Sequence, residues 1–355
     1  MPTFEKLEYS VGFATPAFLG DANQQGQWRT PPFKALLREW WRVGQAGRFN
    51  YDVNEMRKAE LDLFGNAASG EGKSHQSRVR LRLNTWAAGD ENVVQGRTEN
   101  HKVYNGRFKV DADLYLGYGP VTLNQSRLAI AADTQNIPTR LTVLIDQARD
   151  GERKAIEDAL LLASGLGAIG SRSRNGWGSL LLQRDGQNLT ISAMLLKSVS
   201  RCWKDCLDLD WPHAIGCEEN KFLIWHTQPK NDWRDVLKDL AALRIKVNTL
   251  AFDRSVNGPQ GRQILSYPVT RHELNGWGGN GRIPSQLRFK VIPAGNQFKG
   301  RIVHIPVSIP TKMQEDAKLS SDSVLKQAIG VWSKVHQELD KRETGLERFA
   351  LGATR

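Results

Sequence analysis

The spacing of apolar residues along the first 200 residues predicts alternating strands and helices. Period-two alternation marks half-buried strands, and a spacing of i, i+3, i+4 and i+7 marks an amphipathic helix that opens at Pro31 and Pro32. The predicted strands lie at residues 7–13, 79–83, 107–116, 141–145 and 179–182, with a last apolar run at 189–195. The predicted helices lie at residues 31–42 and 152–163.

The second half of the chain shows the same order of elements. Its apolar pattern predicts a strand at 222–225, a helix opened by Asp232, a short strand near 264–269, a hairpin at 287–291 and 303–307, and a last helix at 324–339. Strand, helix, strands and helix in this order are typical of a split βαβ, ferredoxin-like module. We therefore predict an α+β fold of tandem ferredoxin-like (RRM-like) domains, at residues 1–199 and 200–355. The polar or glycine-rich stretches 84–106 and 253–284 are predicted to be long insertions.

Composition narrows the class of protein. Apolar residues make up 40% of the 355 residues, enough for real cores, and no run of 18 apolar residues suggests a membrane span. Three cysteines argue against a disulfide scaffold, and the start of the chain does not resemble a signal peptide, so we expect a reducing cytoplasm. The net charge of +11 and the pI of about 9.6 favour a polyanionic partner.

A glycine-rich loop at 165–178 is the first candidate site. Gly165-Leu-Gly167-Ala-Ile-Gly170 matches G-x-G-x-x-G, but a helix precedes it and a strand follows, the reverse of a dinucleotide site. Glycines also let a backbone approach phosphates closely, which would place Arg172, Arg174 and Trp177 against RNA. A tight turn with solvated arginines is the alternative.

Two further basic segments stand out. Lys34, Arg38 and Arg42 are spaced by four on the predicted first helix, with Trp41 on the same side and Trp40 on the buried side. Arg78, Arg80 and Arg82 form one face of a predicted strand. Each is either an RNA contact or an ordinary solvated face. The stretch 67–74 nearly spells a P-loop, but its first glycine is missing and no strand leads into it.

Metal and nuclease chemistry have weaker signals. Cys202, Cys206, His213 and Cys217 supply three thiols and an imidazole, which makes zinc possible, although the first spacing is looser than in the usual zinc knuckle. His75 and His101 lie in loops of a basic region, and either is a candidate general base for RNA cleavage. No acid is paired with either histidine in the sequence.

Four stretches together resemble the RAMP proteins of CRISPR–Cas systems. They are Phe13-Ala-Thr-Pro-Ala-Phe-Leu-Gly-Asp21, Arg29-Thr-Pro-Pro-Phe-Lys-Ala-Leu-Leu-Arg-Glu-Trp-Trp-Arg42, Leu63-Phe-Gly65 with Gln76-Ser-Arg-Val-Arg80, and the glycine loop. Within the superfamily the chain looks most like the first Cmr subunit of type III-B effector complexes. The match in the second half is limited to an outline, with Arg282-Ile-Pro-Ser285 before a strand.

The resemblance implies a non-catalytic RNA-binding subunit that holds guide RNA near its 3′ end together with paired target RNA, beside other Cmr subunits. It implies no cofactor. The alternative within the superfamily is a guide-processing endoribonuclease that uses His75 or His101, and a basic scaffold that touches only proteins is a third class. The residues expected to bind RNA are Lys34, Arg38, Trp41, Arg42, Arg78, Arg80, Arg82, Arg172, Arg174, Trp177 and Arg282.

Overall fold

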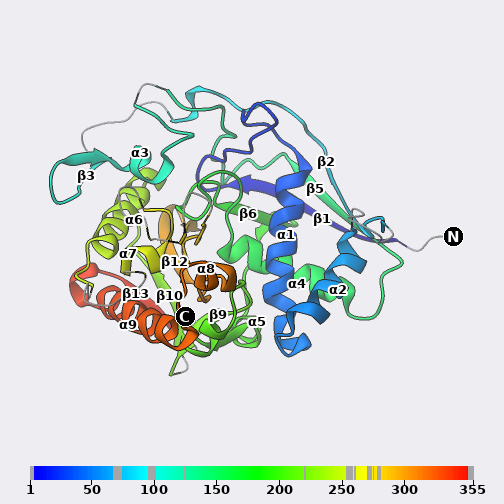
Figure 1. The fold of residues 1–355 in the computed structure, drawn as a ribbon. Coiled ribbons are helices and arrows are strands. Elements are labelled where there is room, and N and C mark those ends of the chain that lie inside the picture. Colours follow the sequence, from blue (N-terminus) through cyan, green and yellow to red (C-terminus); the bar gives the residue numbers. More distant parts are fainter. Residues whose placement is uncertain are drawn as a thin grey trace.

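The computed structural model describes residues 4–66, 74–94, 101–123, 125–219, 221–252, 259, 261–269, 274, 276–277 and 281–350. The near P-loop at 67–73 and parts of the two predicted insertions lie outside these residues. Helices and strands alternate through both halves of the chain (Figure 1). Among the described residues, none of the helices has the length and apolar character needed to span a membrane.

The first half contains an antiparallel sheet and the helices that follow its strands. Its elements are β1 (Phe4–Phe13), α1 (Thr30–Gln45), η1 (Ala46–Phe49), α2 (Val53–Phe64), β2 (Val79–Leu83), η2 (Asn92–Val94), β3 (Lys102–Tyr104), β4 (Lys109–Asp111), α3 (Ala112–Gly117), β5 (Arg140–Asp146), α4 (Glu152–Leu166), β6 (Leu180–Arg184), β7 (Gln187–Asn188) and α5 (Ala193–Ser198). The sheet order is β2-β5-β1-β6-β7, and all its pairs are antiparallel. With α1 and α4 between strands, this is the order of a ferredoxin-like unit.

The second half repeats this topology. Its elements are β8 (Ser200–Cys202), η4 (Asp205–Asp208), β9 (Ile215–Glu218), β10 (Lys221–His226), α6 (Trp233–Asn248), α7 (Gly261–Leu265), β11 (Leu287–Ala294), β12 (Gln297–His304), α8 (Thr311–Asp316), α9 (Ser321–Leu339), η5 (Arg342–Thr344) and β13 (Glu347–Ala350). The order β11-β12-β10 continues through β9 and β8, and β13 also pairs with β10. The predicted α+β, tandem ferredoxin-like class is thus confirmed, while the division between residues 199 and 200 stays a prediction.

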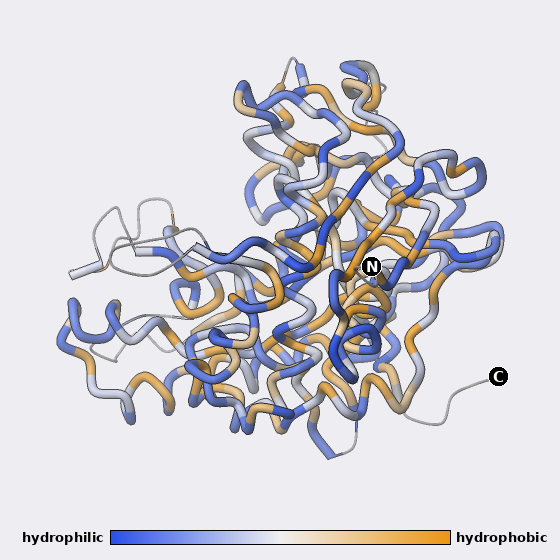
Figure 2. Tube along the Cα trace, turned by 90° about the vertical axis from the view of Figure 1, so that its right-hand side faces the viewer, coloured by the Kyte–Doolittle hydropathy of each residue, from blue (hydrophilic) through white to orange (hydrophobic). Residues whose placement is uncertain are grey.

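Amphipathic patterning explains how each unit forms its core. Along β1, Leu7, Tyr9, Val11 and Phe13 are buried together with one face of α1 and of α4. Figure 2 shows this alternation of hydrophobic and hydrophilic residues along the chain. Because side chains alternate across a strand and repeat every three or four residues on a helix, both elements bury one face and leave the other to solvent.

Two local predictions are wrong. Residues 107–116 form only the short strand β4 before helix α3, because the Asp111 carboxylate caps that helix by accepting a bond from the Leu114 amide at 2.8 Å. The apolar run at 189–195, for which no element type was predicted, ends in helix α5, which Ser192 caps. Near residue 264 the chain is helical, as α7, since a short apolar run fits a buried helical turn as well as a strand.

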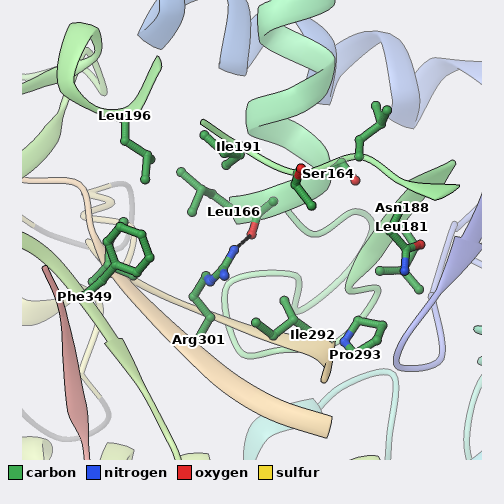
Figure 3. Close-up of a pocket in the computed structure, with 14 residues that line it drawn as sticks. Ser164, Leu166, Leu181, Asn188, Ile191, Leu196, Ile292, Pro293, Arg301 and Phe349 are labelled. Atoms are coloured by element: carbon green, nitrogen blue, oxygen red, sulfur yellow. Dashed lines mark hydrogen bonds between the residues drawn. The ribbon is translucent and has the colours of Figure 1, made fainter. Parts of the chain in front are cut away.

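Cations from the second unit join the two halves. The Lys290 side chain is fully buried, and its ammonium donates to the carbonyl of Leu180 at 2.6 Å and to that of Gly167. The Arg301 Nη1 donates to the carbonyl of Gly165 at 2.6 Å (Figure 3). Beside Arg301 lies a mostly apolar pocket of about 270 Å³ lined by both halves, including Ile191. The glycine loop is therefore a seam between the units.

Candidate nucleic-acid interface

A basic cleft lies between α1 and β2. It has a volume of about 490 Å³ and is lined from one side by Thr30, Pro31, Lys34, Ala35 and Arg38, and from the other by Gln76, Ser77, Val79, Arg80 and Leu81. The fold thus brings together two of the three basic segments that the sequence singled out. Three of the predicted RNA-binding residues, Lys34, Arg38 and Arg80, line this one cleft.

The amphipathic pattern places these side chains. Helix α1 buries Phe33, Leu36, Leu37 and Trp40, which leaves Lys34 and Arg38 on its outer side. Strand β2 is at the edge of its sheet, and its alternation buries Val79 and Leu83 while Arg80 and Arg82 are exposed. An edge strand beside a helix leaves a groove with a basic rim on both sides.

The Lys34 ammonium is the least compensated cation of the cleft. Burial lowers its pKa, and the nearby Arg38 guanidinium lowers it further. Among the described residues, no carboxylate pairs with Lys34. The first turn of α1 contains no acidic residue, and its cap residue Arg29 makes no side-chain capping bond, so the positive end of the helix dipole adds to the charge. The Arg80 guanidinium has a long, half-exposed contact of 3.4 Å to Asp146, and it lies 5.9 Å from the centroid of the Phe4 ring. The cleft therefore suits an anion.

Glu60 of α2 holds the other two arginines of the helix stripe. Its carboxylate accepts bonds from Arg38 Nε at 2.7 Å and from Arg42 Nε and Nη2 at 2.8 Å each. Burial alone would raise the pKa of Glu60, but the hydrogen bonds from Arg42 and Arg38 outweigh it and lower that pKa. Sequence spacing missed this partner, because Glu60 lies 18 residues beyond Arg42 on another helix.

Arg78 does not line the cleft, and its ion pairs instead stabilise the fold. Its guanidinium bonds the Glu152 carboxylate at 2.6 Å and the Asp62 carboxylate at 2.9 Å, and its side chain is 15% exposed. The hydrogen bond with Glu152 is the main cause of the raised pKa of Arg78. These bonds tie β2 to α2 and α4. Arg82, by contrast, is exposed on the same strand.

The glycines of the loop make room for protein, not phosphate. A Cβ at Gly178 would lie 2.0 Å from the carbonyl oxygen of Ile169, and one at Gly170 would lie 2.5 Å from that of Phe18. Both glycines also have positive φ, at +63° and +89°. The prediction of an exposed, phosphate-cradling loop is therefore wrong for most of its length. Its exposed part is the tip, at Ser171 and Arg172.

The two tryptophans expected to bind RNA are both buried. Trp177 has an exposed fraction of 0%, and its ring lies 5.3 Å from that of Phe18 and 6.0 Å from that of Trp233. Trp41 is 4% exposed and packs edge-on against Phe64. Neither indole face is open to a base, so both assignments are corrected to core residues. Trp40 is buried, as predicted.

The remaining predicted arginines lie apart from the cleft. Arg174 shares a small pocket of about 140 Å³ with Glu39 and Arg288, whose side chains form an ion pair at 2.6 Å. Burial lowers the pKa of Arg174, and the Arg288 charge adds to this. Arg172 is exposed at the loop tip, and Arg282 of the second half is exposed and donates to the carbonyl of Gly281. The loop and the helix meet through Glu39, not through the basic stripe.

The hydrophobic pattern of the sequence did not reveal a hairpin that carries basic and aromatic residues. Strands β3 and β4 form a two-stranded ribbon that projects from the body of the protein (Figure 1). Tyr104 is 64% exposed and Phe108 is 62% exposed, and Lys102, Arg107 and Lys109 lie on the same ribbon. Exposed rings among cations are typical of single-strand binding by stacking. The sequence feature that could have revealed it is the Asn105-Gly106 pair, because Asn-Gly is common in hairpin turns.

The candidate metal and nuclease residues do not assemble into a site among the described residues. There, no group of three or more His, Cys, Asp or Glu side chains is placed to hold a metal ion. The Nδ1 of His213 lies 2.7 Å from the carbonyl oxygen of Trp211, and Cys206 is buried. His75 is exposed, and the Nε2 of His101 lies 3.7 Å from an oxygen of Asp235.

Comparisons with known proteins agree with the sequence motifs. The model of the RAMP superfamily matches residues 31–180, which span α1, the basic strand and the glycine loop. The expected RAMP resemblance is thus confirmed for this part of the chain. No curated protein matches the sequence.

Solved structures similar to this chain have low sequence identity to it. They include apo Cmr1 from Pyrococcus furiosus, with 16% identity, 85% of this chain and 87% of that chain covered, and a TM-score of 0.43. A chain of the type III-B Cmr-beta bound to cognate target RNA has 15% identity, 93% and 99% coverage and a TM-score of 0.44. A second Cmr-beta structure, with target RNA, AMPPnP and ssDNA, has 14% identity, 94% and 100% coverage and a TM-score of 0.44.

Proposed function

We propose that this chain is an RNA-binding subunit of a type III-B (Cmr) CRISPR RNA-guided antiviral effector complex. It holds guide RNA near the 3′ end and the paired target RNA, contacts neighbouring Cmr subunits, and is not itself the nuclease. The RAMP match over residues 31–180 supports the class, and one observation supports the binding role. That observation is the cleft between α1 and β2, where Lys34 is partly buried without a carboxylate partner among the described residues.

The cleft fits a nucleic-acid backbone better than a protein surface or a small substrate. Lys34 near the start of α1 and Arg80 on β2 supply positive charges, which neutralise phosphates whatever the base sequence. Stacking is available on the hairpin, through Tyr104 and Phe108. Guide pairing reads the sequence in such a complex, so a surface of charges and rings is sufficient. The proposal involves no cofactor.

The nuclease alternative has less support. A general base needs a geometry that places it beside the scissile group and an acid. Exposed His75 has no acid partner among the described residues, and His101 faces Asp235 outside the basic cleft. We therefore propose that cleavage of guide or target belongs to other subunits. Incubation of the purified chain with repeat RNA tests this, and specific cleavage lost on His75→Ala or His101→Ala would contradict it.

The binding proposal is tested with a double variant of the cleft. Lys34→Ala with Arg80→Ala removes two phosphate partners without touching the Glu60 pairs, so the slope of log affinity against log salt should fall by about 1.4 for single-stranded RNA. Lys326→Ala with Arg342→Ala is the matched control, because both side chains are exposed on the second unit. Filter binding over a salt series measures the slopes. Equal slopes for the two double variants would reject the cleft.

A tagged chain tests the assembly itself. We expect it to co-purify with other Cmr subunits and with a small guide RNA from cells that carry the system. Recovery of the protein subunits without RNA, together with no salt-dependent retention of RNA by the pure chain on a filter, would favour a purely protein-binding scaffold.

A further inference from the structure

We propose that a second, polar pocket of this chain binds a single nucleotide of the RNA that runs over the β3–β4 hairpin. The pocket has a volume of about 640 Å³, within the roughly 300–1,000 Å³ of small-ligand sites. The hairpin turn forms one wall, and the end of α6 with α7 and the residues after it forms the other. Its lining is Asn105, Gly106, Arg107, Tyr115, Ile245, Asn248, Thr249, Arg262, Ser266, Pro268 and Val269.

The charge of the pocket selects an anionic ligand. Arg107 comes from the turn and Arg262 from α7, so the two guanidinium groups belong to different halves of the chain. Within the described part of the chain, neither guanidinium has a hydrogen bond or an ion pair, and none of the lining residues is acidic. Uncompensated arginines on two walls match a phosphate, which they bind in a forked geometry.

The rest of the lining suits a base and a ribose rather than a bare phosphate. Asn248 donates from its amide to the Tyr115 hydroxyl at 3.3 Å, which leaves its carbonyl oxygen and second N–H for a ligand. The Ser266 hydroxyl adds a donor and an acceptor, and α6 ends beside it with its negative dipole end. A phosphate avoids that end, whereas the amino group of a base is favoured there. The ligand is therefore oriented, phosphate to the arginines and base to α6.

The hairpin supplies the route to the pocket. Tyr104 and Phe108 flank the turn that forms its wall, so RNA bases stacked on these rings bring the next nucleotide to Arg107. This step rests on the proposed function, because it takes the ligand to be part of a bound RNA strand. The pocket is separate from the cleft between α1 and β2, since the two share no lining residue.

Nucleoside monophosphates test the pocket without any RNA. The 5′-monophosphates of adenosine, guanosine, cytidine and uridine are titrated into the full chain by calorimetry, beside inorganic phosphate and the free nucleosides. We expect at least one monophosphate to bind, and to bind more tightly than either phosphate or its nucleoside. Arg107→Ala and Arg262→Ala should each weaken binding about tenfold or more, the loss of one charge-assisted contact. Arg57→Ala, an exposed arginine of α2, is the matched control.

Each outcome bears on a different claim. No binding by any monophosphate, binding equal to that of phosphate alone, or binding unchanged in both arginine variants overturns the nucleotide pocket. These results leave the RNA cleft intact if the salt slope still falls on Lys34→Ala with Arg80→Ala. Conversely, monophosphate binding lost in the arginine variants supports the pocket even where the cleft variant leaves RNA binding unchanged. Because both arginines are exposed, neither variant removes a core contact.

Discussion

Replacement of Glu60 separates fold stability from RNA affinity. In Glu60→Gln the carboxylate becomes a neutral amide, and three charge-assisted bonds to Arg38 and Arg42 are weakened. Bonds to a charged group are worth about 1.5–3 kcal/mol each when fully buried. Here the arginine side chains are 31% and 37% exposed, so water replaces much of what is lost. We expect a loss of about 2 kcal/mol in the free energy of unfolding, or about 2–3 °C in melting temperature.

The same substitution should strengthen RNA binding. Arg38 lines the cleft, and without the Glu60 charge it adds an uncompensated positive charge there. The salt slope of RNA binding should therefore steepen by up to about 0.7 for each arginine that gains a phosphate. Glu55→Gln is the control on the same helix, because its carboxylate is 57% exposed and bonds the exposed Lys58. That control should change stability by less than about 0.5 kcal/mol.

The pH dependence gives an independent check. The pKa of Glu60 is lowered in the folded state, since its hydrogen bonds to the arginines outweigh burial. Its contribution to stability is then fully present above the unfolded pKa of about 4.3 and is lost as pH falls through the folded value. Urea unfolding of wild type and Glu60→Gln should converge at low pH. A constant difference between pH 7 and pH 3, or a variant as stable as wild type at pH 7, would refute the reasoning.

Two further outcomes follow from burial. Trp177→Ala should cost about 3–5 kcal/mol, whereas Trp86→Ala, at a 57% exposed side chain, should cost less than about 0.5 kcal/mol in the same thermal unfolding series. Burial lowers the pKa of His336 to about 3, and its Nε2 lies 2.9 Å from Nδ1 of buried His304. Because the unfolded chain binds more protons, stability should fall as pH drops below about 6.5, and His336→Leu should flatten that slope in urea unfolding.

The sequence predicted the elements whose burial is strictly periodic. Helix α1, strands β1 and β5, and helices α4, α6 and α9 all follow from one apolar face, because a whole face must pack on a sheet. Strand β10 was instead predicted from a continuous apolar run, and it is buried on both faces. The failures are short segments where a cap decides the structure. At 107–116 apolar and polar residues alternate in the sequence as they would in a strand. In the structure Asp111 instead caps helix α3, and its bond to the Leu114 amide stabilises a helical turn.

The partners of charged side chains could not be predicted from residue spacing in the sequence. Lys34 and Arg38 were predicted to lie on one face of a helix, which depends only on local spacing, and in the structure both line the same cleft. That Arg38 and Arg42 bond Glu60, or that Arg78 bonds Glu152 across 74 residues, depends on how elements pack. The exposure of a tryptophan is equally non-local. Trp177 was expected at the surface because glycines and arginines surround it in sequence, yet Gly176 and Gly178 beside it let the Leu237 side chain and the Ile169 backbone come close.

The net charge of +11 overstates the positive surface that RNA can reach. Lys290 and Arg301 each donate to carbonyls of the segment 165–180, and Arg244 bonds the Asn175 side chain at 2.9 Å, so these three cations hold the glycine loop against the second unit. A cation engaged with backbone carbonyls in the interior releases no counterion from a nucleic acid. The salt dependence of RNA binding should therefore reflect only the cations left at the surface. Arg172 at the loop tip is one of these, and its position depends on both units, because the seam that fixes the loop is built from both.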